Sequence, residues 1–135
     1  MVGTLNNSVP AQDLQYKNMI NVMRKSFTYL NRGTAVTVGT LPAGAIVIGG
    51  GVQIITTFNG SGTDLLDIGT TADADEFASA LAISATAPVW VAADELATNN
   101  SYSATSDLYV TCTYTDQNSD ATAGEAEIVI YYVTK

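Results

Sequence analysis

Histidine is absent from this sequence of 135 residues, and cysteine occurs once. The lack of histidine removes the commonest general base at neutral pH and the commonest metal ligand. One cysteine alone cannot make a structural zinc site. Cys112 has no partner for an intrachain disulfide. Because no histidine could activate its thiol, we interpret Cys112 as a small packed side chain rather than a nucleophile.

Charged residues are also scarce, at 13% of the chain, about half the usual share of ~25%. Hydrophobic residues make up 47%, so the surface must be covered by threonine, serine, asparagine, alanine and glycine. Such a neutral polar surface is common in secreted proteins and viral shells. The N-terminal sequence lacks the apolar core of a signal peptide, and no apolar run approaches the ~20 residues of a membrane span. We therefore expect no membrane partner.

The few charges are unevenly distributed. Residues 1–32 carry four bases against one acid, whereas residues 33–135 carry one base against twelve acids. We call these segments the basic head and the acidic body. We expect nucleic acid to be repelled by the acidic body. The basic head could contact an acidic partner, including the body of a neighbouring subunit; an ordinary solvated face is the alternative.

Strand patterns dominate the sequence from residue 27 onward. Turn signals separate apolar, alternating runs, as at Leu41–Gly44 (LPAG) and Asn59–Gly62 (NGSG). The triplet Gly49–Gly51 predicts a bulge or a sharp bend. About seven or eight short strands predict an all-β fold, an antiparallel β-sandwich of jelly-roll type. We divide the chain into residues 1–32, an extended N-terminal arm or short helix plus the first strand, and residues 33–135, the sandwich body.

Two stretches have features of helices. In residues 13–24, Leu14, Met19, Ile20 and Met23 partly follow helical spacing, although an irregular arm is the alternative. Glu76–Ile83, with the sequence EFASALAI, is the best local helix former in the body. An acid just before it, Asp73 or Asp75, could cap a short helical turn.

Three acids lie within four residues, at Asp73, Asp75 and Glu76. They could supply oxygen ligands to calcium, but the EF-hand pattern, with its central glycine and its glutamate at position 12, is absent. General acid–base catalysis needs two carboxylates at a fixed separation across a cleft, which one short segment does not supply. We favour a turn with capping and solvated acids, and calcium binding stays open.

The run from Leu41 to Phe77, LPAGAIVIGGGVQIITTFNGSGTDLLDIGTTADADEF, resembles a recurrent segment of small virion proteins of tailed bacteriophages, above all head decoration (cement) proteins. The final strand, AEIVIYYV, fits the same pattern, so the resemblance covers residues 27–135. It implies a β-sandwich, often a homotrimer, that sits on the outer capsid surface and contacts the major capsid protein. It brings no catalytic residues, and we expect no cofactor and assign no metal site, with calcium at the acidic stretch as the open alternative.

The resemblance therefore predicts a structural virion protein that stabilises the shell and is not an enzyme. Its partners would be the major capsid protein and copies of itself, and it would assemble in the host cytoplasm, which suits a free cysteine. An alternative function is a carbohydrate-binding module on the virion surface or tail, with Trp90 and Tyr102 as candidate contacts. The candidate capsid-binding residues are the bases of the head, Lys17, Arg24, Lys25 and Arg32.

Overall fold

The computed structural model describes residues 20–84, 89–90 and 106–134. Within these ranges the chain forms eight β-strands and one turn of 3₁₀-helix, which confirms the all-β class. In chain order these elements are β1 (Asn21–Thr28), η1 (Tyr29–Asn31), β2 (Ala35–Leu41), β3 (Ile46–Thr56), β4 (Asp64–Thr70), β5 (Ala78–Ala82), β6 (Val89–Trp90), β7 (Leu108–Asp116) and β8 (Glu125–Val133).

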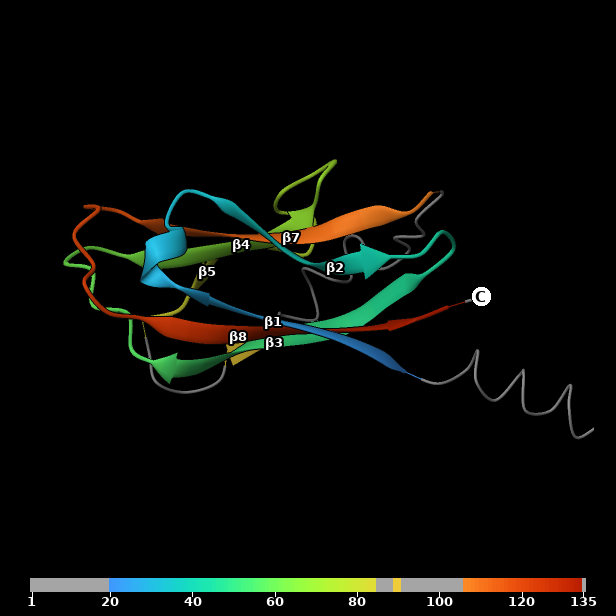
Figure 1. Ribbon diagram of the computed structural model, residues 1–135, viewed down its shortest axis with the longest axis horizontal. Helices are drawn as coiled ribbons and strands as arrows, with labels where there is room; N and C mark the ends of the chain where they lie inside the picture. The colour runs from blue at the N-terminus through green and yellow to red at the C-terminus, as the bar shows by residue number, and fades with distance from the viewer. Residues whose placement is uncertain (1–19, 85–88, 91–105, 135) are drawn as a thin grey trace, which may run out of the picture.

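The described strands form two sheets of four that stack as two layers (Figure 1). One sheet has the order β1–β8–β3–β6, and the other has the order β2–β7–β4–β5. All neighbouring strands are antiparallel. This order is that of an eight-stranded jelly roll, so the predicted sandwich is confirmed. The strand predicted within the basic head is β1, which pairs with β8 and belongs to the first sheet.

The core lies between the two sheets, and the alternation of each strand places it there. On β8, Ala126, Ile128 and Ile130 are buried, while the residues between them are half-buried. Alternate side chains of a strand point to opposite faces of the sheet, so one face of β8 forms the core and the other faces outward. The face of β7 that carries Val110, Cys112 and Tyr114 is likewise buried.

Three aromatic rings fill one end of the core. Phe27, Phe58 and Tyr114 form a triangle, with ring centroids 5.7 Å apart for Phe27 and Phe58, 4.8 Å for Phe58 and Tyr114, and 6.4 Å for Phe27 and Tyr114. All three residues are nearly inaccessible to solvent. Rings at such separations attract one another beyond the gain from burying their area. This cluster supports the end of the sandwich at which the candidate site lies.

Glycines lie at the predicted bulge in β3 and at the predicted turn before it. The register of β3 with β8 shifts between Val47 and Gly49, so the predicted bulge is present at the start of the glycine triplet. At the LPAG turn, the Ala45 N–H donates to the Pro42 carbonyl at 3.0 Å. Gly44 has a φ of 82°, which is the left-handed conformation that glycine adopts at little cost. The predicted turn is therefore confirmed.

The helix considered for residues 13–24 is wrong where the structure describes it. Asn21–Arg24 belongs to β1, which pairs with β8 along its whole length, and residues 13–19 lie outside the described residues. Met23 and Phe27 are four residues apart and both buried, a spacing that suits a strand as well as a helix. Cross-strand pairing, which the local sequence does not reveal, decides between the two.

The short helix considered for Glu76–Ile83 is also wrong. Ala78–Ala82 forms β5, an edge strand that pairs with β4. Phe77 and Ile83, on either side of it, are both buried in the core. Helix propensity is a weak preference that tertiary packing overrides, and anchoring both ends of an alanine-rich stretch holds it extended.

Candidate functional site

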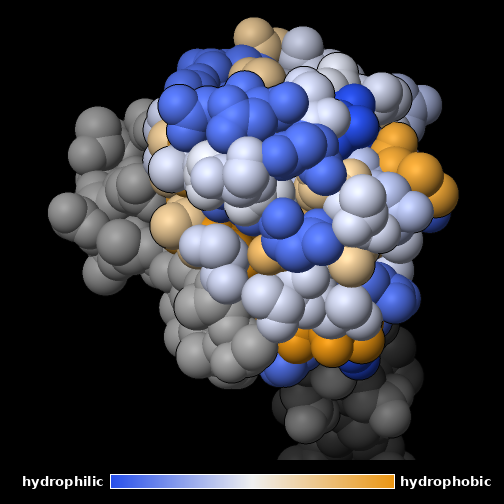
Figure 2. Space-filling view, turned by 90° about the vertical axis from the view of Figure 1, so that its left-hand side faces the viewer, coloured by the Kyte–Doolittle hydropathy of each residue, from blue (hydrophilic) through white to orange (hydrophobic). Residues whose placement is uncertain are grey.

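Three connections between strands meet at one end of the sandwich, on the left of Figure 1. They are residues 29–34 between β1 and β2, residues 57–63 between β3 and β4, and residues 117–124 between β7 and β8. We call this region the loop end. Seen end-on, it is mostly hydrophilic, and strongly apolar residues appear chiefly near its margins (Figure 2). Its polar character suits contact with water or with a polar partner.

Hydrogen bonds join two of these connections. Asn59 Oδ1 accepts from the backbone N–H groups of Thr122 at 2.8 Å and Ala123 at 2.9 Å. The Ser61 N–H donates to Asp120 Oδ1 at 2.9 Å. These side chains satisfy backbone N–H groups of the opposite loop that would otherwise lack an acceptor in the protein. The two loops therefore form one hydrogen-bonded surface.

A buried network of charged groups lies beneath the loop end. Asp64 begins β4 and Asp116 ends β7, the two are paired across the strands, and they are 1% and 4% exposed. The Tyr114 hydroxyl donates to Asp64 Oδ1 at 2.6 Å. Asp116 Oδ2 accepts from the Arg32 guanidinium at 2.9 Å and from the Ala121 N–H at 2.7 Å. The network thus ties two of the connections to the ends of the strands.

These contacts shift the pKa values of the network. The hydrogen bond from the Ala121 N–H, together with the Arg32 guanidinium, holds the pKa of Asp116 below its usual range. Burial, and then the hydrogen bond to Asp64, raise the pKa of Tyr114. Asp116 is therefore charged and Tyr114 is protonated at neutral pH, and the network acts as a structural clamp.

The Asp64 carboxylate is incompletely satisfied, because its Oδ2 has no hydrogen-bond partner among the described residues. The loop closes directly over it: a Cβ added at Gly60 would lie 2.7 Å from Oδ1 of both Asp64 and Asp116. Only glycine therefore fits at position 60. Within the part of the chain that the structure describes, no group of three or more histidine, cysteine or acidic residues is placed to hold a metal ion.

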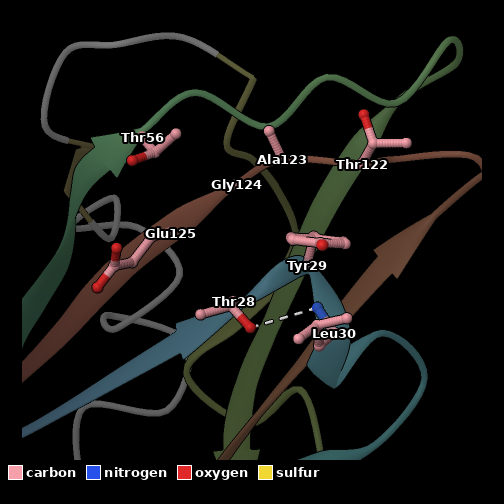
Figure 3. Close-up of a pocket in the computed structure, with 8 residues that line it drawn as sticks. All are labelled: Thr28, Tyr29, Leu30, Thr56, Thr122, Ala123, Gly124 and Glu125. Carbon is pink, nitrogen blue, oxygen red and sulfur yellow. Dashed lines mark hydrogen bonds between the residues drawn. The ribbon is translucent and has the colours of Figure 1, made fainter.

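A pocket of about 290 Å³ opens at the loop end (Figure 3). Glu125 lies between Thr28 and Thr56 in one row across three strands, since it pairs with both. The Tyr29 N–H donates to the Gly124 carbonyl at 3.0 Å, a bond that joins two of the lining residues. The lining residues are Thr28, Tyr29, Leu30, Thr56, Thr122, Ala123, Gly124 and Glu125.

The bases of the head have different surroundings. Arg24 is exposed on β1 and forms an ion pair with Glu127 of β8. Lys25 is exposed beside it. Arg32 lies after η1, and its guanidinium is held by the buried Asp116. Lys17 lies outside the described residues. The pairing with Asp116 gives Arg32 a structural role that the sequence did not indicate.

The two candidate glycan contacts are described little or not at all. Trp90 forms β6 with Val89, and its backbone pairs with Gly51 of β3. Nothing is described of the Trp90 side chain, and Tyr102 lies outside the described residues. The carbohydrate-binding alternative therefore stays a prediction.

The acidic stretch lies in the connection between β4 and β5. Asp73 and Asp75 are exposed, and the Asp73 carbonyl accepts the Thr70 N–H at 2.7 Å, which closes a turn. Partial burial, and then a hydrogen bond with Asp73, raise the pKa of Glu76. The predicted turn is confirmed, without the short helix that the acids were expected to cap.

Sequence reasoning missed the acids that matter most at the loop end. Asp64 and Asp116 continue the buried faces of their strands: DLLDI places Asp64 in line with Leu66 and Ile68, and both neighbours are fully buried. The sequence signal that could have identified Asp64 is an acid that alternates in line with core residues of the same strand. For Glu125 no such signal exists, because it follows the same outward alternation as Glu127.

Among solved structures, chains from three phage capsids share this fold. A chain in the capsid asymmetric unit of cyanophage Pam1 has a TM-score of 0.63 and 18% identity, over 86% of this chain and 85% of that chain. A chain of the acid-stable capsid of Helicobacter pylori bacteriophage KHP30 has a TM-score of 0.64 and 17% identity, over 86% and 88%. A chain of the Ralstonia phage GP4 capsid has a TM-score of 0.62 and 15% identity, over 87% and 86%. No family model and no curated protein matches the sequence.

Proposed function

We propose that this chain is a structural protein of a bacteriophage virion, a decoration protein that binds the outer surface of the head and stabilises the shell. The observation that carries the proposal is the fold likeness to chains of three phage capsids, each matched over 85% or more of both chains. Each of those chains therefore has about the length of this one. The sequence resemblance to cement proteins, which concerns residues 27–135, points the same way.

The composition supports this role. A surface rich in neutral polar residues, with 13% charged residues, suits a particle exterior. The protein would act by mass action: a subunit that binds the assembled shell, and not its separated parts, stabilises the assembled state. Such an activity needs a specific docking surface and no catalytic group.

The basic head is the proposed docking segment. Lys25 is exposed, and Arg24 is exposed although it is paired with Glu127. Lys17 and Arg32 complete the set, with Arg32 also engaged by Asp116. Opposite charges across an interface steer association and fix its orientation more than they add affinity. We therefore assign the first contact with an acidic shell to the exposed bases.

The test uses empty heads that lack this protein, prepared from the phage whose genome encodes it. Purified protein should cosediment with the heads and raise the temperature at which they disrupt. Lys25→Glu should weaken cosedimentation and make it less dependent on salt, while Thr37→Glu, an exposed position on the other sheet, serves as a control that adds an acid elsewhere. Heads that neither retain the protein nor gain heat tolerance would contradict the proposal.

A further inference from the structure

We propose that the pocket at the loop end binds the cationic side chain of an arginine or lysine presented by a partner protein, with Glu125 as the group that receives its charge. This inference does not depend on the virion role, because it concerns the chemistry of the pocket alone. The partner is defined by a basic side chain that projects from its surface into the space between Thr28, Thr56 and Tyr29.

The charge of the pocket is the first argument. Glu125 is the only charged residue among those described in the lining. Two positions along β8, Glu127 faces the same side of the sheet and is neutralised by Arg24 of β1. Arg24 lies opposite Val129 and reaches Glu127 diagonally, since the residue directly opposite Glu127 is Ser26. The corresponding diagonal position of β1 for Glu125 is Ser26 rather than a base, and Glu125 has no ion-pair partner among the described residues. One of two equivalent acids is thus left for a cation from outside.

The hydrogen-bonding groups are the second argument. Arginine and lysine side chains carry donors and no acceptor, so a site for them must offer acceptors. The Glu125 carboxylate supplies two oxygens, and the hydroxyls of Thr28 and Thr56 stand on either side of it in the same row. A charge-assisted bond to the carboxylate would be the strongest of these contacts.

The apolar side of the pocket is the third argument. Figure 3 shows Tyr29 and Leu30 across the pocket from Glu125 and Thr56. Leu30 is 76% exposed, so its side chain is available for contact with a partner. The aliphatic stem of a lysine or arginine packs on such side chains while its charged end reaches a polar group, and a cation can also lie over the Tyr29 ring.

The pocket is small, and hydrogen bonds connect the residues of its rim. Its volume of about 290 Å³ lies at the lower limit of ligand pockets, which suits one side chain better than a larger ligand. The Thr28 hydroxyl accepts from the Leu30 N–H, and the Asn31 side chain accepts from the Thr28 N–H at 2.8 Å. These bonds hold the rim of the pocket before any partner arrives, which lowers the entropy lost on binding.

The experiment is an NMR titration of the full chain with N-acetyl-arginine amide. N-acetyl-citrulline amide, which has nearly the same shape and no charge, serves as the comparison ligand. We expect the backbone amide signals of Tyr29, Leu30, Gly124 and Glu125 to shift together and to saturate with the arginine compound. Citrulline should bind about fivefold more weakly, the effect of one exposed ion pair at the upper end of its usual range.

Two variants with the same net charge decide whether Glu125 is responsible. Glu125→Gln should weaken arginine binding by about the same factor of five, whereas Glu127→Gln should leave it unchanged. Equal binding of arginine and citrulline, equal effects of the two variants, or no shift of these amides would each overturn the proposal. So would a neutral monosaccharide that shifts the same amides more strongly than arginine, since the pocket would then be a glycan site.

Discussion

Asp116, at the end of β7, is a buried acid with strong donors around it. Replacing it by asparagine removes the negative charge that Arg32 faces and weakens the bond from the Ala121 N–H. We expect Asp116→Asn to lower the melting temperature at pH 7, as measured by circular dichroism. Asp75→Asn, an exposed acid in the β4–β5 turn, changes the net charge equally and should have little effect.

The difference in melting temperature between the native chain and Asp116→Asn should also depend on pH. The pKa of Asp116 is lower in the folded chain than the ordinary value of 3.8, so its ionised form favours the folded state. This contribution is complete above pH 3.8 and is lost as the pH falls toward the folded pKa. The difference in melting temperature between the native chain and Asp116→Asn should therefore shrink below about pH 4. A difference that stays constant down to pH 2 would contradict the assigned clamp.

Cys112 should be chemically silent in the folded protein. Burial raises the pKa of its thiol to about 12, and the thiol is 1% exposed. Since the thiolate is the reactive form, we expect negligible labelling by a disulfide reagent at pH 8 and full labelling in denaturant. A Ser79→Cys variant, exposed on β5, should react at once in the folded state and serves as the control. Rapid labelling of Cys112 without denaturant would show that β7 opens locally.

At this scale the sequence was informative only where a residue's role follows from alternation. Cys112 was correctly predicted as a packed side chain, because LYVTCTYT places it in line with Val110 and Tyr114. The pairing of Arg32 with Asp116 could not be predicted, since 84 residues separate them and only the fold brings them together. The distinction between Glu125 and Glu127 depends on which residue of β1 lies diagonally across from each acid, Ser26 for Glu125 and Arg24 for Glu127, and that is a matter of register.

Among the secondary-structure elements, strands were predicted better than their alternatives. Runs of β-branched residues bounded by turn signals identified most of the strands, whereas both stretches considered as helices proved to be strands in the described residues. In β1 and β5 the local sequence is ambiguous, and the choice is made by pairing with β8 and β4. Short apolar segments cannot be assigned by periodicity alone.

Gly124, at the entry to β8, should be intolerant of substitution. Its φ of 149° is rarely adopted by other residues, and a Cβ there would overlap the Phe58 ring. We expect Gly124→Ala to lower the free energy of unfolding by more than ~2 kcal/mol, because strain and overpacking add. Urea denaturation monitored by tyrosine fluorescence measures this.

Gly33, after η1, is the matched control for Gly124. It also has a positive φ, 72°, but a Cβ there would meet nothing within 4 Å. Gly33→Ala should therefore cost only the conformational strain, about 1 kcal/mol. Equal losses in the two variants would show that contact with Phe58 contributes nothing.

For the whole molecule, the class was predictable and the strand order was not. The jelly roll pairs β1 with β8, whose Arg24 and Glu127 are 103 residues apart, and no local pattern encodes such a pairing. The uneven distribution of charge, by contrast, is visible in the sequence, and in the fold the exposed bases Arg24 and Lys25 both lie on β1.

The oligomeric state is also a property of the whole molecule. We expect a homotrimer, as the resemblance to cement proteins implies, and light scattering after size exclusion should give three times the chain mass of 14.1 kDa. A mass of one chain would contradict the trimer and would favour a subunit that attaches to the shell singly. Either result leaves the fold unchanged.

The central claim is that this chain lies on the outer surface of a phage head, and immunogold electron microscopy tests it most directly. Antibodies raised against the purified protein would be applied to intact virions of the phage that encodes it, without disrupting the particles. The account predicts gold particles distributed over the heads, and their loss when the gene is deleted. Gold confined to the tails, or absent from intact particles that contain the protein, would contradict it.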